Sequence, residues 1–380
     1  MSEWRTVPFH TLFRRVSKRT GFADEELLSV YRDYGVIRKR DRDDNFNRPG
    51  DLDDYQLVKE GELVLNKMKT WQGSLGVSPY QGIVSPAYFV FSPEVEMDSR
   101  FIHHALRCRD CIDFYAAHSS GIRVNQWDLI PEWLDVMPVP VPDLRTQRRI
   151  AEYLDTEVGE MDAMVARLEK LIADLEARRK SVITEKVLGA HTNGLITSRF
   201  WMAVELITDT DETSTAGVSL EDFVSWSGGL NIDSIQDRED KLEGTPFKAG
   251  DLLFGKLRPY LAKSWVADDR GVASGDIHVY RARAGYDISF LGYLVRTPEF
   301  IQFAKSCSRG VKMPRVEWTA LSQFQFDAPD LGTQRRIAAE LDEETEAVDG
   351  IIARSRTLID DLKARKSALI AEVVTGRKQV

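Results

Sequence analysis

The sequence is poor in cysteine, with Cys108, Cys111 and Cys307 as the only three among 380 residues. Three thiols cannot form a disulfide framework, and such scarcity is typical of proteins from a reducing compartment. The sequence also lacks a run of 18 apolar residues, so we expect no membrane span. The first residues, MSEWR, lack the apolar stretch of a signal peptide. These absences predict a cytoplasmic protein.

An excess of basic residues is missing too. The formal net charge is −9, whereas proteins that bind DNA on their own usually carry a basic excess. Residues 1–141 contain 18 lysines and arginines against 21 acidic residues, and residues 190–328 contain 15 against 19. If the ligand is DNA, the cations must therefore cluster locally, or a partner must supply most of the phosphate contacts.

No catalytic motif is visible in the sequence. It has no Gly-x-x-x-x-Gly-Lys-Ser/Thr loop for ATP, no Gly-x-Gly-x-x-Gly after an expected strand, no Asn-Pro-Pro-Tyr/Phe for adenine methylation and no Gly-x-Ser-x-Gly nucleophile elbow. We therefore do not expect an enzyme that cleaves or methylates DNA in one chain.

What the sequence does contain is an internal repeat. Residues 142–151 read PDLRTQRRIA and residues 329–338 read PDLGTQRRIA, an offset of 187. The offset then holds without a gap as far as Gly189 and Gly376. A repeat of this length indicates two copies of one structural unit.

A long helix is expected after each copy of the phrase. In the first copy, apolar residues recur at spacings of four and three from Leu154 to Val182, the pattern of a coiled-coil seam. Thr345 and Ser355 interrupt the corresponding seam in the second copy. From about 146 to 187 the helix would be about 60 Å long. We expect the two helices to pair antiparallel within one chain; the alternative is that each pairs with another molecule.

The segments between the helices repeat more weakly. Residues 61–69 match 250–258 at an offset of 189, and residues 12–17 resemble 220–225 at a larger offset. Each copy is therefore expected to mix strands and helices around its own core. The expected elements are a strand at 62–68 or 251–257, another at 86–91 or 276–283, and a helix at 99–117 or 288–306.

This organisation resembles the specificity subunit of type I restriction-modification systems, over nearly the whole chain. In that family two target-recognition domains alternate with two helical repeat regions, each opening with a Pro-rich phrase that ends in Gln and Ile. The phrases here are residues 137–150 and 326–337. The family often has Glu where Thr146 and Thr333 stand, a small departure because Thr is a good helix N-cap.

The resemblance implies an α+β fold with an internal pseudo-two-fold repeat. Two mixed α/β target-recognition domains, residues 1–145 and 191–332, would be joined by two long helices that form an antiparallel coiled coil. The helical repeat regions would cover residues 146–190 and 333–380.

The resemblance also implies a function. The chain would be a non-catalytic subunit that reads a bipartite, asymmetric target in double-stranded DNA, one half-site per globular domain. It would scaffold DNA adenine methyltransferase (modification) subunits, two in number, with restriction subunits left open. S-adenosylmethionine, ATP and magnesium would belong to those partners. The alternatives are a coiled-coil scaffold that never touches DNA, favoured by the acidic charge, and a specificity module of another methyltransferase-nuclease type.

Two stretches in each copy carry side chains suited to DNA. Arg, Lys, Asn and Gln read base edges, and cations bind phosphates. In the first stretch, cations alternate with apolar residues at the end of an expected strand, so both would point to one face. A solvated strand edge is the alternative. The residues of this stretch are Lys67, Lys69, Lys256 and Arg258.

The second stretch is a polar loop led by glycine, at 119–126 and 308–315. Cations and amides in such a loop suit both phosphate contact and base readout; an ordinary helix-to-strand connection is the alternative. The candidate residues are Arg123, Asn125, Gln126, Arg309, Lys312 and Arg315.

Two basic runs occur in the first copy alone. Residues 14–19 hold four cations and would suit a phosphate clamp, while the match at 221–226 is acidic. Residues 38–42 hold four more cations. Aspartates lie among them and directly after them, which favours a solvated loop.

Paired arginines stand at the start of each expected helix, where cations are unfavourable to the helix dipole. Docking of a partner subunit would explain them; an ion pair with Glu152, Asp155 or their counterparts is the alternative. These residues are Arg148, Arg149, Arg335 and Arg336.

A zinc site is not expected. His103, His104, Cys108 and Cys111 have a spacing with some likeness to a ligand set. The second copy, however, has no metal ligand at the matching positions. We therefore expect Cys108 and Cys111 to be core residues of a helix.

Overall fold

The computed structural model describes residues 4–19, 25–32, 34–42, 52–123, 126–189, 196–209, 212–214, 217–231 and 242–380. The chain divides into two compact units. Unit 1 comprises Met1–Leu168 with Thr357–Val380, and unit 2 comprises Glu169–Arg356. Each unit therefore contains one globular part and a portion of both long helices.

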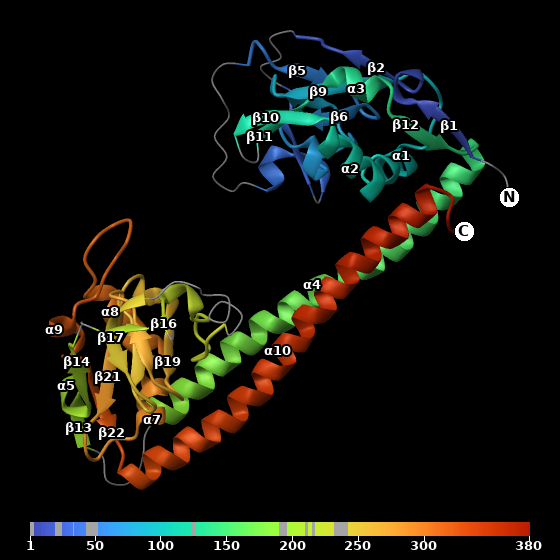
Figure 1. The fold of residues 1–380 in the computed structure, drawn as a ribbon. Coiled ribbons are helices and arrows are strands. Elements are labelled where there is room, and N and C mark those ends of the chain that lie inside the picture. Colours follow the sequence, from blue (N-terminus) through green and yellow to red (C-terminus); the bar gives the residue numbers. More distant parts are fainter. Residues whose placement is uncertain are drawn as a thin grey trace. The chain divides into compact units, whose positions relative to one another are not determined.

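The elements of the first globular part are shown in Figure 1. Its strands are β1 (Arg5–Pro8), β2 (Phe13–Val16), β3 (Leu28–Tyr31), β4 (Gly35–Arg38), β5 (Gln56–Val58), β6 (Leu63–Asn66), β7 (Leu75–Val77), β8 (Gly82–Val84), β9 (Tyr88–Pro93), β10 (Ser119–Arg123), β11 (Gln126–Leu129) and β12 (Pro138–Val141). Its helices are α1 (Ser99–Ala105), α2 (Arg109–Ala117) and α3 (Pro131–Asp135). The long helix α4 (Leu144–Leu188) follows.

The second globular part repeats many of these elements. Its strands are β13 (Ile196–Arg199), β14 (Val204–Ile207), β15 (Glu212–Ser214), β16 (Gly217–Val218), β17 (Leu242–Phe247), β18 (Leu252–Gly255), β19 (Ser264–Val266), β20 (Gly271–Ala273), β21 (Ile277–Ala282) and β22 (Gln325–Ala328). Its helices are α5 (Phe200–Ala203), α7 (Ile288–Leu294), α8 (Pro298–Ser306) and α9 (Trp318–Leu321). The long helix α10 (Leu331–Val374) ends the chain.

A four-stranded antiparallel sheet lies at the centre of each globular part. The strand order is β2-β9-β6-β7 in unit 1 and β14-β21-β18-β19 in unit 2. The register is the same as well, because Leu63 pairs with Phe91 and Leu252 pairs with Tyr280, both shifted by the same offset. The α+β architecture and the repeat predicted from the sequence are therefore present in both copies.

One predicted alignment is wrong. Residues 12–17 do not correspond to 220–225, because β2 pairs with β9 in the place where β14 pairs with β21. The short sequence match was fortuitous, since Leu220–Asp222 forms a single 3-10 turn outside this sheet. Glu205 takes the register position of Arg14, so the second copy still lacks the basic run.

The predicted single helices at 99–117 and 288–306 are each broken into two. In unit 2 the break falls at Thr297-Pro298, where the Thr297 hydroxyl accepts a hydrogen bond from the Phe300 N–H (3.3 Å). Proline cannot continue the preceding helix because it lacks the N–H, but it suits the first turn of a new one. In unit 1 Cys108, in extended conformation, starts the second helix.

Both long helices pack into the core of each unit. In unit 1 the core contains Ile150 and Leu154 from the start of α4 and Val373 from the end of α10. In unit 2 it contains Leu341 from the start of α10 and Val187 from the end of α4. The beginning of one helix and the end of the other are thus anchored on the same globular part.

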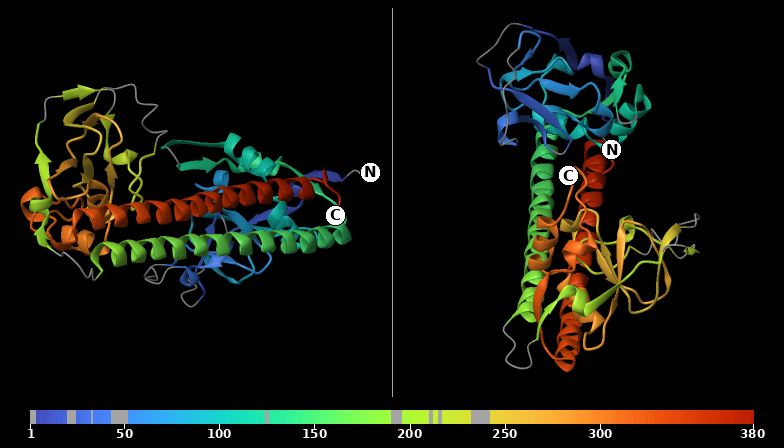
Figure 2. Two further views of the ribbon diagram at one scale, coloured as in Figure 1. Left: turned by 90° about the horizontal axis from the view of Figure 1, so that it is seen from below. Right: turned by 90° about the vertical axis from the view of Figure 1, so that its left-hand side faces the viewer.

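Within each unit the paired helix segments run antiparallel (Figure 2). In unit 1, Asp162 accepts a hydrogen bond from Lys366 (2.7 Å), and Tyr153, earlier in α4, contacts Lys378, later in the chain. The predicted seam residues of α4 are all buried or half-buried.

The same direction holds in unit 2, where ion pairs join the two helices. Glu176 contacts Arg356 (3.1 Å), whereas Lys186, further along α4, contacts Glu340 (3.0 Å), earlier in α10. Interhelical ion pairs of this kind flank the apolar seam in coiled coils and set the relative direction of the helices.

The repeated Pro-Asp-Leu-x-Thr-Gln phrase starts each long helix. The Asp143 carboxylate accepts hydrogen bonds from the Thr146 N–H (3.0 Å) and hydroxyl (2.7 Å), and Asp330 does the same with Thr333. These bonds, led by that of the threonine hydroxyl, lower the pKa of Asp143 and Asp330. The N-cap is therefore the aspartate and not the threonine, and each helix begins two residues earlier than expected.

The glutamine of the phrase fixes each helix to its globular part. The Gln334 side chain is 1% exposed; its amide donates to Pro329 O (2.8 Å) and its carbonyl accepts from the Asp287 N–H (2.9 Å). Gln147 makes the same two bonds with Pro142 O and the Asp98 N–H. Each glutamine thus joins the helix start to the loop before α1 or α7.

Gln334→Met is therefore expected to lower the free energy of unfolding by about 1–3 kcal/mol, because a buried N–H and a buried carbonyl lose their partner while the volume stays similar. Urea unfolding of the full chain measures the change. Gln302→Met, at an exposed position of α8, is the matched control and should change stability by less than about 0.5 kcal/mol. Equal effects of the two substitutions would show that the amide does not anchor the helix.

Candidate nucleic-acid interface

In unit 2 the two candidate stretches are brought together. Lys256 follows β18 directly; its N–H donates to Asp276 O (3.0 Å) and its carbonyl accepts from the Val316 N–H (2.9 Å). The Arg258 N–H donates to Pro314 O (2.7 Å). Residues 256–258 are therefore hydrogen-bonded to the end of the glycine-led loop, although the two stretches were predicted as separate candidates.

The loop itself is a narrow reversal of the chain. Arg309 and Arg315 exchange both backbone hydrogen bonds (2.9 Å each), and Gly310 has a φ of +98°. A left-handed φ is accessible to glycine at no steric cost, so this residue permits the turn. Between the paired arginines the side chains of Val311, Lys312 and Met313 are exposed, with Val311 at 103%.

The cations of this region differ in availability. Arg258, Arg309 and Lys312 are exposed and, among the described residues, take part in no ion pair. Arg315 is paired with Asp276. Burial, followed by the positive charge of Arg315, lowers the pKa of Lys256. The three exposed cations are the best placed for phosphates or base edges.

Unit 1 builds the same junction from other side chains. The Lys67 N–H donates to Ala87 O (3.0 Å) and its carbonyl accepts from the Leu129 N–H (3.0 Å), the counterparts of the bonds at Lys256. The loop after α2 is a β-hairpin of β10 and β11, with Arg123 opposite Gln126 in the register. Asn125 and the side chains of Arg123 and Gln126 lie outside the described residues. Trp71 and Trp127 bring their rings to 4.7 Å across this junction.

The basic run at 14–19 joins Lys67 in a cation cluster. The Arg15 guanidinium lies 4.4 Å and the Lys67 ammonium 4.9 Å from the centre of the Phe89 ring. Burial lowers the pKa of Lys67 most, and the charges of Arg15 and Arg19 lower it further. Like charges held this close favour an anionic ligand, because an anion would relieve their mutual repulsion.

The prediction that paired cations share one face of a strand is wrong. β6 ends at Asn66 and β18 at Gly255, so Lys67, Lys69, Lys256 and Arg258 all follow the strand ends. Lys67 is half-buried and donates to Pro86 O, whereas Lys69 is exposed. A turn after the strand therefore separates side chains that simple alternation would have placed together.

The second basic run, at 38–42, is more ordered than a solvated loop. Arg38 stacks on Tyr80 (4.4 Å) and Arg42 on Tyr31 (4.5 Å), while Arg40 forms an ion pair with Glu26 (3.1 Å). The expected solvated loop is replaced by a 3-10 turn, Lys39–Asp41, flanked by two arginines that cover aromatic rings. Sequence spacing carries no signal for these contacts, because Tyr31 lies on β3 and Tyr80 lies between β7 and β8.

The arginines at the helix starts have acidic neighbours, but not those expected. Arg148 lies 3.7 Å from Glu96, and Asp155 instead contacts Arg100 and His104. Arg335 lies 3.7 Å from Asp287, and Arg336 pairs with Glu340 (2.9 Å). The side chains of Arg148, Arg149, Arg335 and Arg336 are exposed on the first turns of α4 and α10.

Cys108 and Cys111 are buried in the core of unit 1. Among the described residues, no group of three His, Cys, Asp or Glu side chains is arranged to hold a metal ion. None of the helices in the described residues is both long enough and apolar enough to cross a membrane.

Sequence comparison gives relatives of one kind. No protein-family model matches the chain. The chain is 24% identical over 275 residues to the type I restriction enzyme EcoDI specificity subunit from Escherichia coli, covering 63% of this chain and 62% of that protein. It is 25% identical over 206 residues to the StySPI specificity subunit from Salmonella potsdam, covering 50% and 44%. The matches thus span less than two thirds of these relatives.

Structure comparison extends over the whole chain. A chain from a structure on complex assembly and conformational transition of the type I R-M system matches with a TM-score of 0.75 at 14% identity, covering 100% of this chain and 99% of that one. The HsdS subunit from Thermoanaerobacter tengcongensis matches with a TM-score of 0.52 at 15% identity, covering 100% and 98%. The resemblance to type I specificity subunits stated from the sequence is confirmed by these matches.

Proposed function

We propose that this chain, whose curated relatives are type I specificity subunits, is the DNA-reading subunit of a type I restriction-modification complex. The observation that carries the proposal is the duplicated junction after β6 and β18. Both copies have the same backbone hydrogen bonds and both place cations there. Two equivalent surfaces of one chain suit two half-sites on one DNA.

The half-sites differ because the two junctions carry different side chains. Unit 1 presents a hairpin, a tryptophan pair and the cluster around Phe89. Unit 2 presents Arg258, Arg309 and Lys312 beside the exposed apolar side chains of Val311 and Met313. Arginine is suited to guanine, and an exposed apolar side chain is suited to the thymine methyl group. The bases that are read therefore depend on the side chains that each junction carries. The target is therefore asymmetric.

The acidic net charge fits a reader that works within a complex. With a net charge of −9, the chain has a local group of cations at each junction and leaves further phosphate contacts to partners. Those partners are two modification subunits that methylate adenine. S-adenosylmethionine, ATP and magnesium belong to them and to any restriction subunit, while this chain has no catalytic role. Arg148, Arg149, Arg335 and Arg336, exposed at the helix starts, are proposed as their docking residues.

The long helices are proposed to set the distance between the half-sites. Residues 146–190 and 333–380 would act as helical repeat regions between reading domains at 1–145 and 191–332. The antiparallel ion pairs within each unit support one continuous coiled coil. Neighbouring accessible stretches of the major groove lie about 34–36 Å apart, and a rod of about 60 Å suits two readers at that spacing or somewhat beyond.

The experiment is methylation sequencing of cells that express the chain with its modification subunit. The proposal predicts adenine methylation at a single bipartite motif, two short half-sites with an unread spacer, that disappears when this gene is deleted. Methylation that persists without the gene would refute DNA reading and favour a scaffold without DNA contact.

A further inference from the structure

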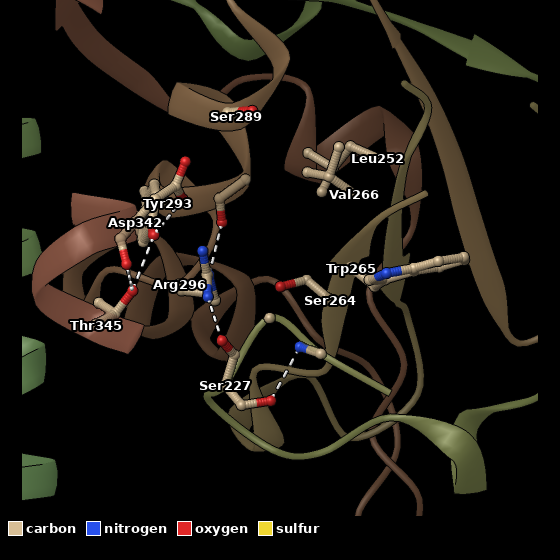
Figure 3. A pocket seen from close by; sticks show the side chains of 13 residues that line it. Ser227, Leu252, Ser264, Trp265, Val266, Ser289, Tyr293, Arg296, Asp342 and Thr345 are labelled. Carbon is tan, nitrogen blue, oxygen red and sulfur yellow. Dashed lines mark hydrogen bonds between the residues drawn. The ribbon is translucent and has the colours of Figure 1, made fainter. Parts of the chain in front are cut away.

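Unit 2 contains a polar cavity of about 280 Å³ beside the N-terminal third of α10 (Figure 3). Its walls come from the loop at 227–229, the strands β18 and β19, and the helices α7 and α10. Leu252 and Ser264, at the inner end of the cavity, are buried, whereas Asp342 on α10 is exposed. The cavity thus leads from the surface to the sheet, and its volume is near the lower end for small-molecule sites.

A buried guanidinium faces this cavity. The Arg296 side chain is 8% exposed; its Nε donates to Gly292 O (2.9 Å), its Nη1 donates to Ser227 O, and it lies 4.3 Å over the Tyr293 ring. No carboxylate of the described residues lies within ion-pair distance of it. The Asp342 carboxylate acts on the guanidinium only from beyond that distance. A buried charge without a close counter-charge is costly, so a ligand that supplies one is favoured.

A second, independent feature points into the same space. Ser264 is 1% exposed, and its hydroxyl has no hydrogen-bond partner among the described residues. Figure 3 shows that hydroxyl directed toward Arg296. Buried hydroxyls normally have a partner, so the unpaired Ser264 hydroxyl marks a position for a ligand oxygen.

The equivalent place in unit 1 is filled by a side chain. Gly292 of unit 2 corresponds to His103 of unit 1, and Arg296 corresponds to Arg107. The His103 imidazole nitrogen contacts Arg107 Nη1 at 2.6 Å, so the arginine of unit 1 has a partner from the preceding helix α1. In unit 2 the glycine removes that partner and leaves the cavity.

The remaining lining limits the shape of the ligand. The Tyr293 hydroxyl donates to Asp342 (2.7 Å) and lies 3.1 Å from the Thr345 hydroxyl, a polar side suited to ligand hydroxyl groups. Leu252 and Val266 provide an apolar wall. A Cβ at Gly228, where φ is +81°, would lie 2.0 Å from Arg296 Nη1, so the loop approaches the guanidinium through glycine.

We infer that this cavity binds a small hydroxylated organic anion through its carboxylate or phosphate group. Arg296 and the Ser264 hydroxyl donate to the oxyanion, and the Tyr293–Asp342 side receives the hydroxyl groups. Charge-assisted hydrogen bonds of this kind are the stronger ones in proteins. The site belongs to unit 2 alone and does not depend on the DNA-reading proposal.

The test is isothermal titration calorimetry on the full chain with inorganic phosphate, glycerol 3-phosphate and glycerate, with glycerol as the uncharged control. At least one of the three anions is expected to bind at a single site, and glycerol is not. Ser264→Ala is expected to weaken that binding by about tenfold or more, without a lower melting temperature, because its hydroxyl has no protein partner to lose. Preference between glycerol 3-phosphate and glycerate distinguishes the phosphate source from the carboxylate source.

Matched variants complete the test. Arg296→Lys is expected to weaken binding by more than tenfold, whereas Arg107→Lys at the equivalent position of unit 1 is expected to leave it unchanged. Ser367→Ala, at an exposed position of α10, serves as the control for Ser264→Ala. Absence of binding by all three anions, or unchanged binding by Ser264→Ala, would overturn the inference.

Discussion

The double substitution Arg258→Ala and Lys312→Ala is expected to lower the affinity of the assembled complex for its cognate DNA by about 30-fold or more. Both side chains are exposed at the unit 2 junction, without an ion pair among the described residues. Loss of one base or phosphate contact costs about 1–3 kcal/mol, and two such losses give at least this factor. Fluorescence anisotropy with a duplex that carries the methylated motif measures the change.

The matched control removes the same charge from the other end of the same sheet. Lys248 precedes β18 and Arg270 follows β19, so both lie at the end of these strands opposite Lys256. Lys248→Ala with Arg270→Ala should change the affinity by no more than about threefold at physiological salt, where the Debye length is about 8 Å. Equal losses in the two double variants would mean that overall charge, and not the junction, attracts the DNA.

The salt dependence separates two kinds of contact. If both removed cations bind phosphates, the slope of log K against log salt should become shallower by about 2. If either reads a base, the variant should also discriminate less between the cognate half-site and altered ones. A variant with unchanged slope and unchanged discrimination would contradict a role in DNA binding.

Insertion of one heptad into both long helices is expected to abolish methylation of the original motif, with a loss of about 100-fold or more. The insertions repeat residues 162–168 after Leu168 and residues 350–356 before Thr357. A heptad keeps the apolar seam in phase to within about 20° and lengthens each helix by about 10 Å. DNA advances about three base pairs over that distance and turns by about 100°, so the half-sites no longer meet both readers.

A single insertion is the control for folding. The heptad in α4 alone leaves α10 too short to continue its pairing, so the melting temperature should fall, whereas the doubly extended chain should keep that of the wild type. Rates of methylation measured on the original motif decide the prediction. A doubly extended, folded chain that still directs wild-type methylation would show that the helices do not set the spacing.

Much of the fold follows from periodicity. The four-three spacing from Leu154 onward gave α4, and the constant offset of 189 gave two sheets with identical register. The positions of turns were harder to predict from the sequence. The strand predicted at 62–68 ends at Asn66, where the amide side chain accepts from the Met68 N–H (3.1 Å) and starts a turn. Alternation of residue types carries no signal for such a turn.

The candidate interface shows the same division. The sequence identified Lys256 and Arg315 as cationic candidates, but their adjacency depends on a hydrogen bond across 60 positions, from the Val316 N–H to Lys256 O. The match of residues 12–17 to 220–225 failed because six residues are too few to set a strand register. The cavity at Arg296 was not predicted from the sequence either; it arises because unit 2 has Gly292 at the position where unit 1 has His103.

Each globular part is proposed to read its own half of the target. The most direct measurement is methylation sequencing after residues 1–141 are replaced by the corresponding part of another type I specificity subunit. We expect a motif in which one half-site and the spacer are retained and the other half-site is that of the donor. A motif changed in both halves, or not changed at all, would contradict it.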